Sequence, residues 1–324
     1  MLDLQQEATK YKSSALAEST KKTYASMKTA YLRFCLHFGL KPVPASPATI
    51  ILYTAFIARS LKNTSIPGYL NIIRLMHIDM DVPNPLGGWE LAMVKKGINR
   101  TLGSPPQQKL PISPEILLLI RRQLNFQRNR DKAFWCACLL AFFSFLRKAS
   151  LLPKSSRIPT ADCLCQSDLQ LEDALLYLTV RHTKTIQFGQ RILKIPIAAI
   201  SGSPLCPLVA TVNMLDSLPA PAAGSQPLFT YIDTRGVTTC LDYASFVKDL
   251  KTCLGKAGFP PGDYSGHSFR RGGCTFAFKV GVPAPVIKLR GDWKSNAYER
   301  YISINDSVNV KCARALSLAA SYAV

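Results

Sequence analysis

The sequence predicts a mainly α-helical protein with a small β-sheet, an α+β fold in two domains. Apolar residues recur at helical spacing through most of the chain, and only two segments have the pattern of strands. The segment LGSPPQQKLP at 102–111 interrupts the periodicity with proline, glycine and glutamine. Because 324 residues are many for one hydrophobic core, we expect domains at 1–103 and 113–324, joined by a linker at 104–112.

The first domain is expected to contain helices alone. Between Ser19 and Gly39 the apolar side chains form a helical stripe that ends at a glycine cap. Ser46, followed by proline, is a typical helix start and opens a second helix. Two further helical patterns span 69–80 and 89–101. The domain therefore has the pattern of a small helical module.

The second domain is expected to be helical with a small sheet inserted. Ser113 caps a new helix, and a strongly apolar helix follows at 133–146. The segments LLYLTV at 175–180 and RILKIPI at 191–197 are the convincing strands, and RHTKTIQFGQ joins them as a hairpin with a long arm. The rest of the chain is predicted to be mostly helical.

Charge and composition narrow the class of protein. Lysines and arginines number 40 against 20 acidic residues, a net charge of +20, and such an excess favours a nucleic acid partner. A hydrophobic content of 48% excludes a disordered chain. The first residues carry no apolar leader and the longest apolar run is too short for a bilayer, so we expect a soluble, intracellular protein. Ten cysteines without CxxC spacing predict reduced, buried thiols and no metal site.

The segment GHSFRRGG at 266–273 concentrates titratable chemistry. His267 and Arg270 are three residues apart, so on a helix they share one face. Together they offer donors to phosphate oxygens and a group that relays a proton. The glycines that follow permit close approach of another backbone. The same spacing also arises by chance, so the segment alone does not establish a site.

Further residues complete a set suited to phosphoryl transfer without a metal. Arg147 ends an otherwise apolar helix, where a lone arginine needs an anion or another partner. Lys184 lies on the exposed arm of the predicted hairpin. Trp293 supplies an indole N–H, and Tyr298 and Tyr301 supply hydroxyl groups.

The order and context of these residues resemble the tyrosine recombinase (phage integrase) family, whose pattern is Arg, Lys, His-x-x-Arg, His or Trp, then Tyr. Here the pattern falls on Arg147, Lys184, His267, Arg270, Trp293 and Tyr301. STKKTYASMKTAYLRFC resembles the start of that family's helical, SAM-like core-binding domain, and KLPISPEIL the start of its catalytic domain. FLRKASLLP, KTIQFGQR and GDWKSNAYERYI are most similar to the eukaryotic mobile-element branch, of the DIRS/Ngaro or Crypton type.

The resemblance implies a site-specific DNA recombinase or integrase. Such an enzyme binds double-stranded DNA and cuts and rejoins it through a 3′-phosphotyrosyl intermediate. It needs no metal, ATP or other cofactor, and it assembles as a dimer to tetramer on DNA. The first domain would be the core-binding, DNA-binding domain, and 113–324 the catalytic domain with a C-terminal helical tail. We expect the protein inside the cell, in the nucleus.

The resemblance also implies a role for each site residue. Tyr301 would be the nucleophile, and Arg147 and Arg270 would clamp the nonbridging phosphate oxygens. His267 would accept the tyrosine proton or steady an oxygen, and Lys184 would protonate the departing 5′-hydroxyl. The tryptophan can only donate through its indole N–H, so it would support the phosphate or the geometry.

Two departures from the family pattern leave alternatives open. The position three residues after Arg147, acidic in many members, is Ser150, and the spacing also admits Tyr298 as nucleophile. The alternative functions are a catalytically inactive, recombinase-derived DNA-binding protein, a type IB topoisomerase-like nicking-closing enzyme, and a basic helical scaffold for acidic proteins. The tail at 307–324 has an apolar helical face, which packs either on its own domain or on a neighbouring protomer.

Overall fold

The computed structural model describes residues 2–103, 108–156, 163–186, 189, 191–218, 226–302, 314 and 317. The chain divides into two compact units, Met1–Gln107 and Gln108–Val324. Residues 104–107 of the expected linker lie outside the described residues, as does the expected C-terminal tail apart from two positions. Within the described part of the chain, no helix combines the length and the apolar character needed to cross a membrane.

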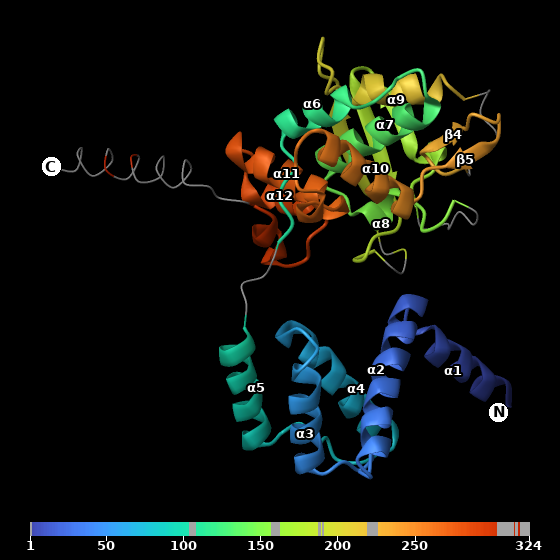
Figure 1. The fold of residues 1–324 in the computed structure, drawn as a ribbon. Coiled ribbons are helices and arrows are strands. Elements are labelled where there is room, and N and C mark those ends of the chain that lie inside the picture. The colour runs from blue at the N-terminus through green and yellow to red at the C-terminus, as the bar shows by residue number, and fades with distance from the viewer. Residues whose placement is uncertain are drawn as a thin grey trace. The chain divides into compact units, whose positions relative to one another are not determined.

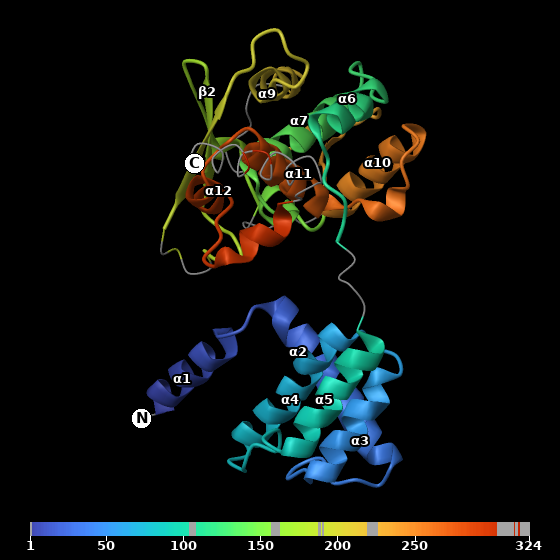
Figure 2. The same ribbon diagram turned by 90° about the vertical axis from the view of Figure 1, so that its left-hand side faces the viewer.

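Among its described residues, unit 1 has helices joined by loops and turns, and no strand. The helices are α1 (Leu2–Ser14), α2 (Glu18–His37), α3 (Pro47–Ala58), the short 3₁₀ helix η1 (Asn63–Ser65), α4 (Ile66–Asp79) and α5 (Trp89–Leu102). Helices α2–α5 surround a core that includes Tyr31, Tyr53 and Ile73 (Figure 2). Helix α1 extends away from this group, and its described side chains are exposed (Figure 1).

The helix boundaries of unit 1 follow the sequence signals. The Ser46 side chain accepts a hydrogen bond from the Thr49 amide at 3.1 Å, so it caps α3 as expected. Gly39 follows α2 with φ of +62°, a conformation that favours glycine. These two residues fix where one helix ends and the next begins.

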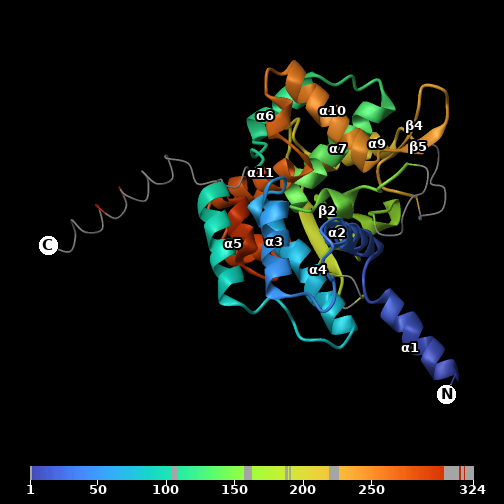
Figure 3. The same cartoon turned by 60° about the horizontal axis from the view of Figure 1, so that its bottom comes forward.

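Unit 2 places helix α7 (Asn129–Ser144) at its centre, packed against α9 (Pro207–Leu215) and α11 (Gly266–Lys279) (Figure 3). Every residue of α7 from Ala133 to Phe142 is buried. The other helices named among the described residues are α6 (Pro114–Arg122), α8 (Lys148–Leu151), α10 (Tyr243–Lys256), α12 (Ala284–Arg290), and the 3₁₀ helices η2 (Gln166–Asp168), η3 (Pro261–Asp263) and η4 (Asn296–Tyr301). Ser113 caps α6 as expected.

Two small antiparallel sheets complete the described part of unit 2. The first has strands β1 (Leu169–Glu172), β2 (Leu175–Val180) and β3 (Leu193–Ala198) in the order β1-β2-β3. Leu178 pairs with Ile195, and both side chains point into the core. The second sheet is a hairpin of β4 (Thr230–Ile232) and β5 (Thr238–Cys240). The mainly α-helical fold with a small sheet is confirmed.

The expectation of only two strands is wrong, because β1, β4 and β5 are also present. These strands have three or four residues, too few to show alternation against a helical pattern. Their turns carried the missed signal. Asp233 accepts hydrogen bonds from the amides of Arg235 and Val237, and Gly236 has φ of +77°.

The placement of Arg147 at the end of the apolar helix is also wrong. Helix α7 ends at Ser144, and Phe145 takes the left-handed conformation with φ of +56°. A bulky residue rarely adopts this conformation, so the sequence gives no sign that the helix stops there. Arg147 is instead the N-cap residue of the short helix α8.

Candidate active site

Helix α11 carries two of the expected site residues and lies unusually close to neighbouring backbone. A Cβ atom on Gly272 would lie 1.8 Å from the Ile112 carbonyl oxygen, and one on Gly273 would lie 2.1 Å from that of Phe142. Only glycine fits at these two positions, which confirms the expected close approach. The helix begins at a capping box formed by Ser265 and Ser268. Packing and cap together set the depth of the helix in the core.

Arg270 is the buried centre of the candidate site, with 1% of its surface exposed. Its guanidinium donates to the carbonyl oxygens of Phe145 and Gly291, the latter at 2.7 Å. The guanidinium carbon lies 3.5 Å from the ring centre of Trp293. Burial, and after it the nearby charge of Arg147, lowers the pKa of Arg270 to about 9, so the side chain remains a cation at neutral pH.

The site contains hydrogen-bond donors without acceptors. Arg270 Nε and Trp293 Nε1 are buried and have no partner among the described residues. None of the ion pairs between described residues includes Arg147 or Arg270. A buried unsatisfied donor costs about 1–3 kcal/mol, and two neighbouring cations repel each other. An anion bound here would relieve both effects.

Tyr301 lies beside this pair of buried donors. The Tyr301 ring centre is 5.2 Å from the Trp293 ring centre, and the Arg270 guanidinium carbon lies 5.2 Å from the Tyr301 ring centre. The Tyr301 carbonyl oxygen accepts a hydrogen bond from Thr275 Oγ1 at 3.2 Å, which ties the end of η4 to α11. Tyr298 is also near Trp293, with ring centres 6.2 Å apart. The ring of Tyr301, rather than that of Tyr298, lies against the guanidinium.

His267 occupies the exposed edge of the cluster. Its ring centre lies 6.4 Å from that of Tyr301, and part of the side chain is open to solvent. Burial of the rest of the ring lowers the pKa of His267 below its usual value, and the charges of Lys148, Arg270 and Arg147 lower it further. At neutral pH the imidazole is therefore mostly uncharged and able to accept a proton.

Lys148 belongs to this surrounding and was missed by the sequence reasoning. Its side chain packs so closely on Gly266 that a Cβ there would lie 2.4 Å from the lysine Cδ. Its Nζ lies 3.7 Å from the ring centre of Tyr243. The signal was its position directly after Arg147, one of the expected site residues.

Lys184 lies on an exposed turn between Thr183 and Ile186, in the arm that joins β2 to β3. The flanking threonines hydrogen-bond to Asp292, the residue immediately before Trp293. Five of the expected residues are thus linked by ring contacts and charge, and the sixth lies on a loop attached to them through Asp292. Asp292 was not among the expected site residues.

Ser150, the departure from the acidic position, is buried in α8. Its amide donates to the Arg147 carbonyl oxygen at 2.8 Å. It lines a small cavity of about 100 Å³ together with Asp168, whose carboxylate pairs with Arg181. The carboxylate that lines this cavity with Ser150 is therefore already paired with another arginine.

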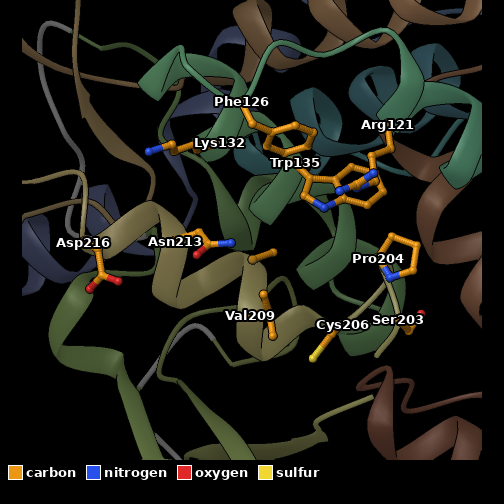
Figure 4. A pocket seen from close by; sticks show the side chains of 11 residues that line it. Arg121, Phe126, Lys132, Trp135, Ser203, Pro204, Cys206, Val209, Asn213 and Asp216 are labelled. Carbon is orange, nitrogen blue, oxygen red and sulfur yellow. The ribbon is translucent and has the colours of Figure 1, made fainter. Parts of the chain in front are cut away.

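A separate cavity of about 420 Å³ lies beside α6, α7 and α9, and Figure 4 shows its lining. Phe126, Trp135 and Val209 give it an apolar surface, with Lys132 and Asp216 at its edges. None of the six expected site residues lines it. It is therefore distinct from the candidate active site.

The chain is similar in sequence to a known integrase/recombinase. No protein-family model matches the chain. An integrase/recombinase XerD homolog of Selenomonas ruminantium is 26% identical over 297 residues, which cover 88% of this chain and 82% of that protein.

Solved structures show the fold. The Tn1549 transposon integrase in complex with circular intermediate DNA is similar with a TM-score of 0.59 and 13% identity, covering 92% of this chain and 94% of that one. A lambda integrase tetramer bound to a Holliday junction is similar with a TM-score of 0.58 and 14% identity, covering 93% of this chain and 76% of that one. The chain has the fold of these integrases. That fold, together with the likeness to the XerD homolog over most of both chains, supports placing the chain in the tyrosine recombinase (integrase) family.

Proposed function

We propose that this protein is a site-specific DNA recombinase that cuts and rejoins double-stranded DNA through a phosphotyrosyl intermediate. The observation that carries the proposal is the pair of buried donors, Arg270 Nε and Trp293 Nε1, without acceptors and beside the Tyr301 ring. A phosphodiester would supply acceptors and negative charge at the point where a tyrosine hydroxyl is available to attack it. The net charge of +20 suits the same substrate.

The arginines supply the charge stabilisation in this proposal. During attack on phosphorus, negative charge grows on the nonbridging oxygens, and Arg147 and Arg270 hold positive charge there before the reaction starts. Arg270 is fixed by two carbonyl oxygens and by Trp293, so little reorganisation is needed. The indole N–H adds one neutral donor.

The proton transfers are divided between two residues. His267 takes the proton of the Tyr301 hydroxyl as the phenolic oxygen bonds to phosphorus. The bond from phosphorus to the 5′-oxygen breaks, and Lys184 gives that oxygen a proton, which leaves a free 5′-hydroxyl and a 3′-phosphotyrosine. The 5′-hydroxyl of another strand then attacks the phosphotyrosine and releases Tyr301. The phosphoester energy is conserved, so the cycle needs no ATP.

We assign residues 1–103 the role of a core-binding domain that contacts DNA, 104–112 the role of a linker, and 113–324 that of the catalytic domain. Assembly as a dimer to tetramer on DNA is supported by the lambda integrase tetramer seen on a Holliday junction. We place the protein in the eukaryotic mobile-element branch on the similarity of KTIQFGQR and GDWKSNAYERYI. In a eukaryote its DNA substrate lies in the nucleus, and we place the protein there.

The proposal is tested by trapping the covalent intermediate. DNA bound by the protein is selected from a random pool, and duplexes of that sequence are nicked at successive positions, so that a short 5′-hydroxyl fragment diffuses away after cleavage. In excess EDTA the wild-type protein is expected to form an adduct that survives denaturant. Tyr301→Phe is expected to abolish the adduct, and the matched variant Tyr298→Phe to retain it.

Other outcomes point to other functions. Cleavage that EDTA abolishes and magnesium restores would indicate a nuclease, and binding without an adduct on any nicked duplex would indicate an inactive DNA-binding protein. Strand exchange between two duplexes separates a recombinase from a nicking-closing enzyme. Binding is expected to weaken with salt at a log–log slope of about −0.9 for each phosphate neutralised.

A further inference from the structure

The arm between β2 and β3 is attached to the centre of the candidate site by one carboxylate. Thr183 Oγ1 donates to Asp292 Oδ2 at 2.6 Å, and Thr185 Oγ1 donates to the same oxygen. The Arg191 guanidinium, at the far end of the arm, donates to Asp292 Oδ1. Asp292 is separated from these residues by about a hundred positions in the sequence, so this connection is purely tertiary.

The donors and acceptors in this connection are matched. Each threonine hydroxyl gives its single hydrogen to the carboxylate, and Thr183 Oγ1 in turn accepts from the amides of Thr185 and Ile186 at 3.1 and 3.0 Å. The side chains and backbone of the turn are therefore held as one unit. Lys184 is the residue between the two threonines.

Asp292 combines a buried side chain with a left-handed backbone conformation. It is 3% exposed and has φ of +55°, in the left-handed region. A buried carboxylate is expensive unless it is paired, and a left-handed residue other than glycine is uncommon. Three donors from the arm compensate for both. The backbone conformation and the contacts to the arm thus depend on each other.

The position of Asp292 in the chain joins the arm to the phosphate-binding groups. The next residue is Trp293, which stacks on the Arg270 guanidinium, and the preceding carbonyl, of Gly291, accepts from that guanidinium. A shift of Asp292 would therefore move both the arm and the groups around Arg270. A lysine on an exposed turn has many rotamers, and a general acid acts only within hydrogen-bond reach of the leaving oxygen.

We propose that Asp292 is a positioning residue that holds the turn of Thr183–Ile186 so that Lys184 reaches the departing 5′-oxygen. This inference rests on the proposed function, because it assumes that a 5′-oxygen leaves. It predicts that Asp292 acts on the proton transfer of Lys184 and leaves the charge stabilisation by arginine intact.

The test compares normal DNA with a duplex in which sulfur replaces the bridging 5′-oxygen. A thiolate leaves without a proton, since the pKa of a thiol lies near 8.5. Asp292→Asn keeps the size of the side chain and tolerates a positive φ, but it removes the charge and one acceptor oxygen. In single-turnover cleavage it is expected to slow normal DNA by roughly 10²-fold, the effect of a misplaced catalytic group, and to approach the wild-type rate on the sulfur substrate.

Two further variants test the same inference even if Asp292→Asn does not fold. The double variant Thr183→Val, Thr185→Val removes the donors from the arm and leaves Asp292 in place, and it is expected to show the same rescue by sulfur. Adding Asp292→Asn to Lys184→Ala is expected to slow cleavage of normal DNA no further than Lys184→Ala alone. Arg147→Ala serves as the contrast, because it is expected to be slow on both substrates.

Several results would overturn the inference. If Asp292→Asn cleaves both substrates equally slowly, the substitution disturbs the arginine groups or the fold. If it cleaves both at the wild-type rate, Asp292 does not position Lys184. If the sulfur substrate does not rescue Lys184→Ala, Lys184 is not the general acid, and the inference about Asp292 is wrong. In all three cases the wild-type protein still forms its adduct, whereas failure of the proposed function leaves the wild-type protein without an adduct on either substrate.

Discussion

The candidate site has two parts that are built differently. Arg270 and Trp293 are buried, and carbonyl oxygens and ring contacts hold them in place. His267 and Lys184 are exposed, and Lys184 depends on a loop held by side-chain hydrogen bonds. Arg270 and Trp293 are therefore held in place before substrate arrives, whereas the groups assigned to proton transfer lie at the open side. Rigidity suits a charge that must not reorganise, and exposure suits groups that exchange protons with water.

The buried part should tolerate change least. Arg270→Ala and Arg270→Lys are both expected to lower the single-turnover cleavage rate by roughly 10²–10³-fold or more, because neither keeps the two-carbonyl fork. The matched control is Arg130→Ala, which removes a guanidinium that pairs with Asp249 at 2.9 Å. That variant is expected to cleave at close to the wild-type rate. Equal losses in both would show that the effect is one of general charge and not of the buried site.

The packing under the buried part is the next test. Gly273→Ala places a methyl group against the Phe142 carbonyl and the Phe145 ring, so it is expected to destabilise the fold by about 1–3 kcal/mol or more, with a lower midpoint of urea unfolding. Gly262→Ala is the control, since no atom lies within 4 Å of its added Cβ. If the two variants unfold at the same urea concentration, α11 is not held as closely as described.

The exposed part should respond to pH. Neutral His267 is the form that accepts a proton, so cleavage is expected to fall as pH drops through its pKa, which lies below the usual value. Lys148 is one of the cations that lower this pKa, so Lys148→Gln is expected to move the acidic limb of the pH–rate profile to higher pH. Lys194→Gln removes a lysine that also stacks on a tyrosine, Tyr177, and should leave the limb in place. An unchanged limb in Lys148→Gln would exclude the proposed influence on His267.

The difference between the two parts also explains what the sequence could predict. Helix caps such as Ser46 and Ser113 act within three residues, so local reasoning located them. The residue types of the proposed site were recognisable because they occur in a characteristic order. The left-handed Phe145, which ends α7 and supplies a carbonyl to Arg270, gave no local sign, because no sequence rule predicts a bulky residue there.

Contacts between distant residues were equally out of reach. Asp292 appeared as one acidic residue in GDWKSNAYERYI, and its role depends on donors in the arm between β2 and β3. Lys148 was not singled out, because the adjacent Arg147 already matched the family pattern. The short strands β4 and β5 were within reach, since Asp233 and Gly236 mark their turn. Sequence reasoning thus proposed candidate reacting groups, and it did not find the residues that contact and position them.

The most direct test of the account is to identify the residue that carries DNA in the covalent adduct. Trypsin cuts after Lys294 and Arg300, so Tyr298 falls in SNAYER and Tyr301 begins YISINDSVNVK. After nuclease digestion of the adduct formed in EDTA, mass spectrometry should find the remaining nucleotides on Tyr301, and fragment ions assign the tyrosine even where the nucleotide blocks cleavage after Arg300. A nucleotide mass on Tyr298, or on any other residue, would contradict the account.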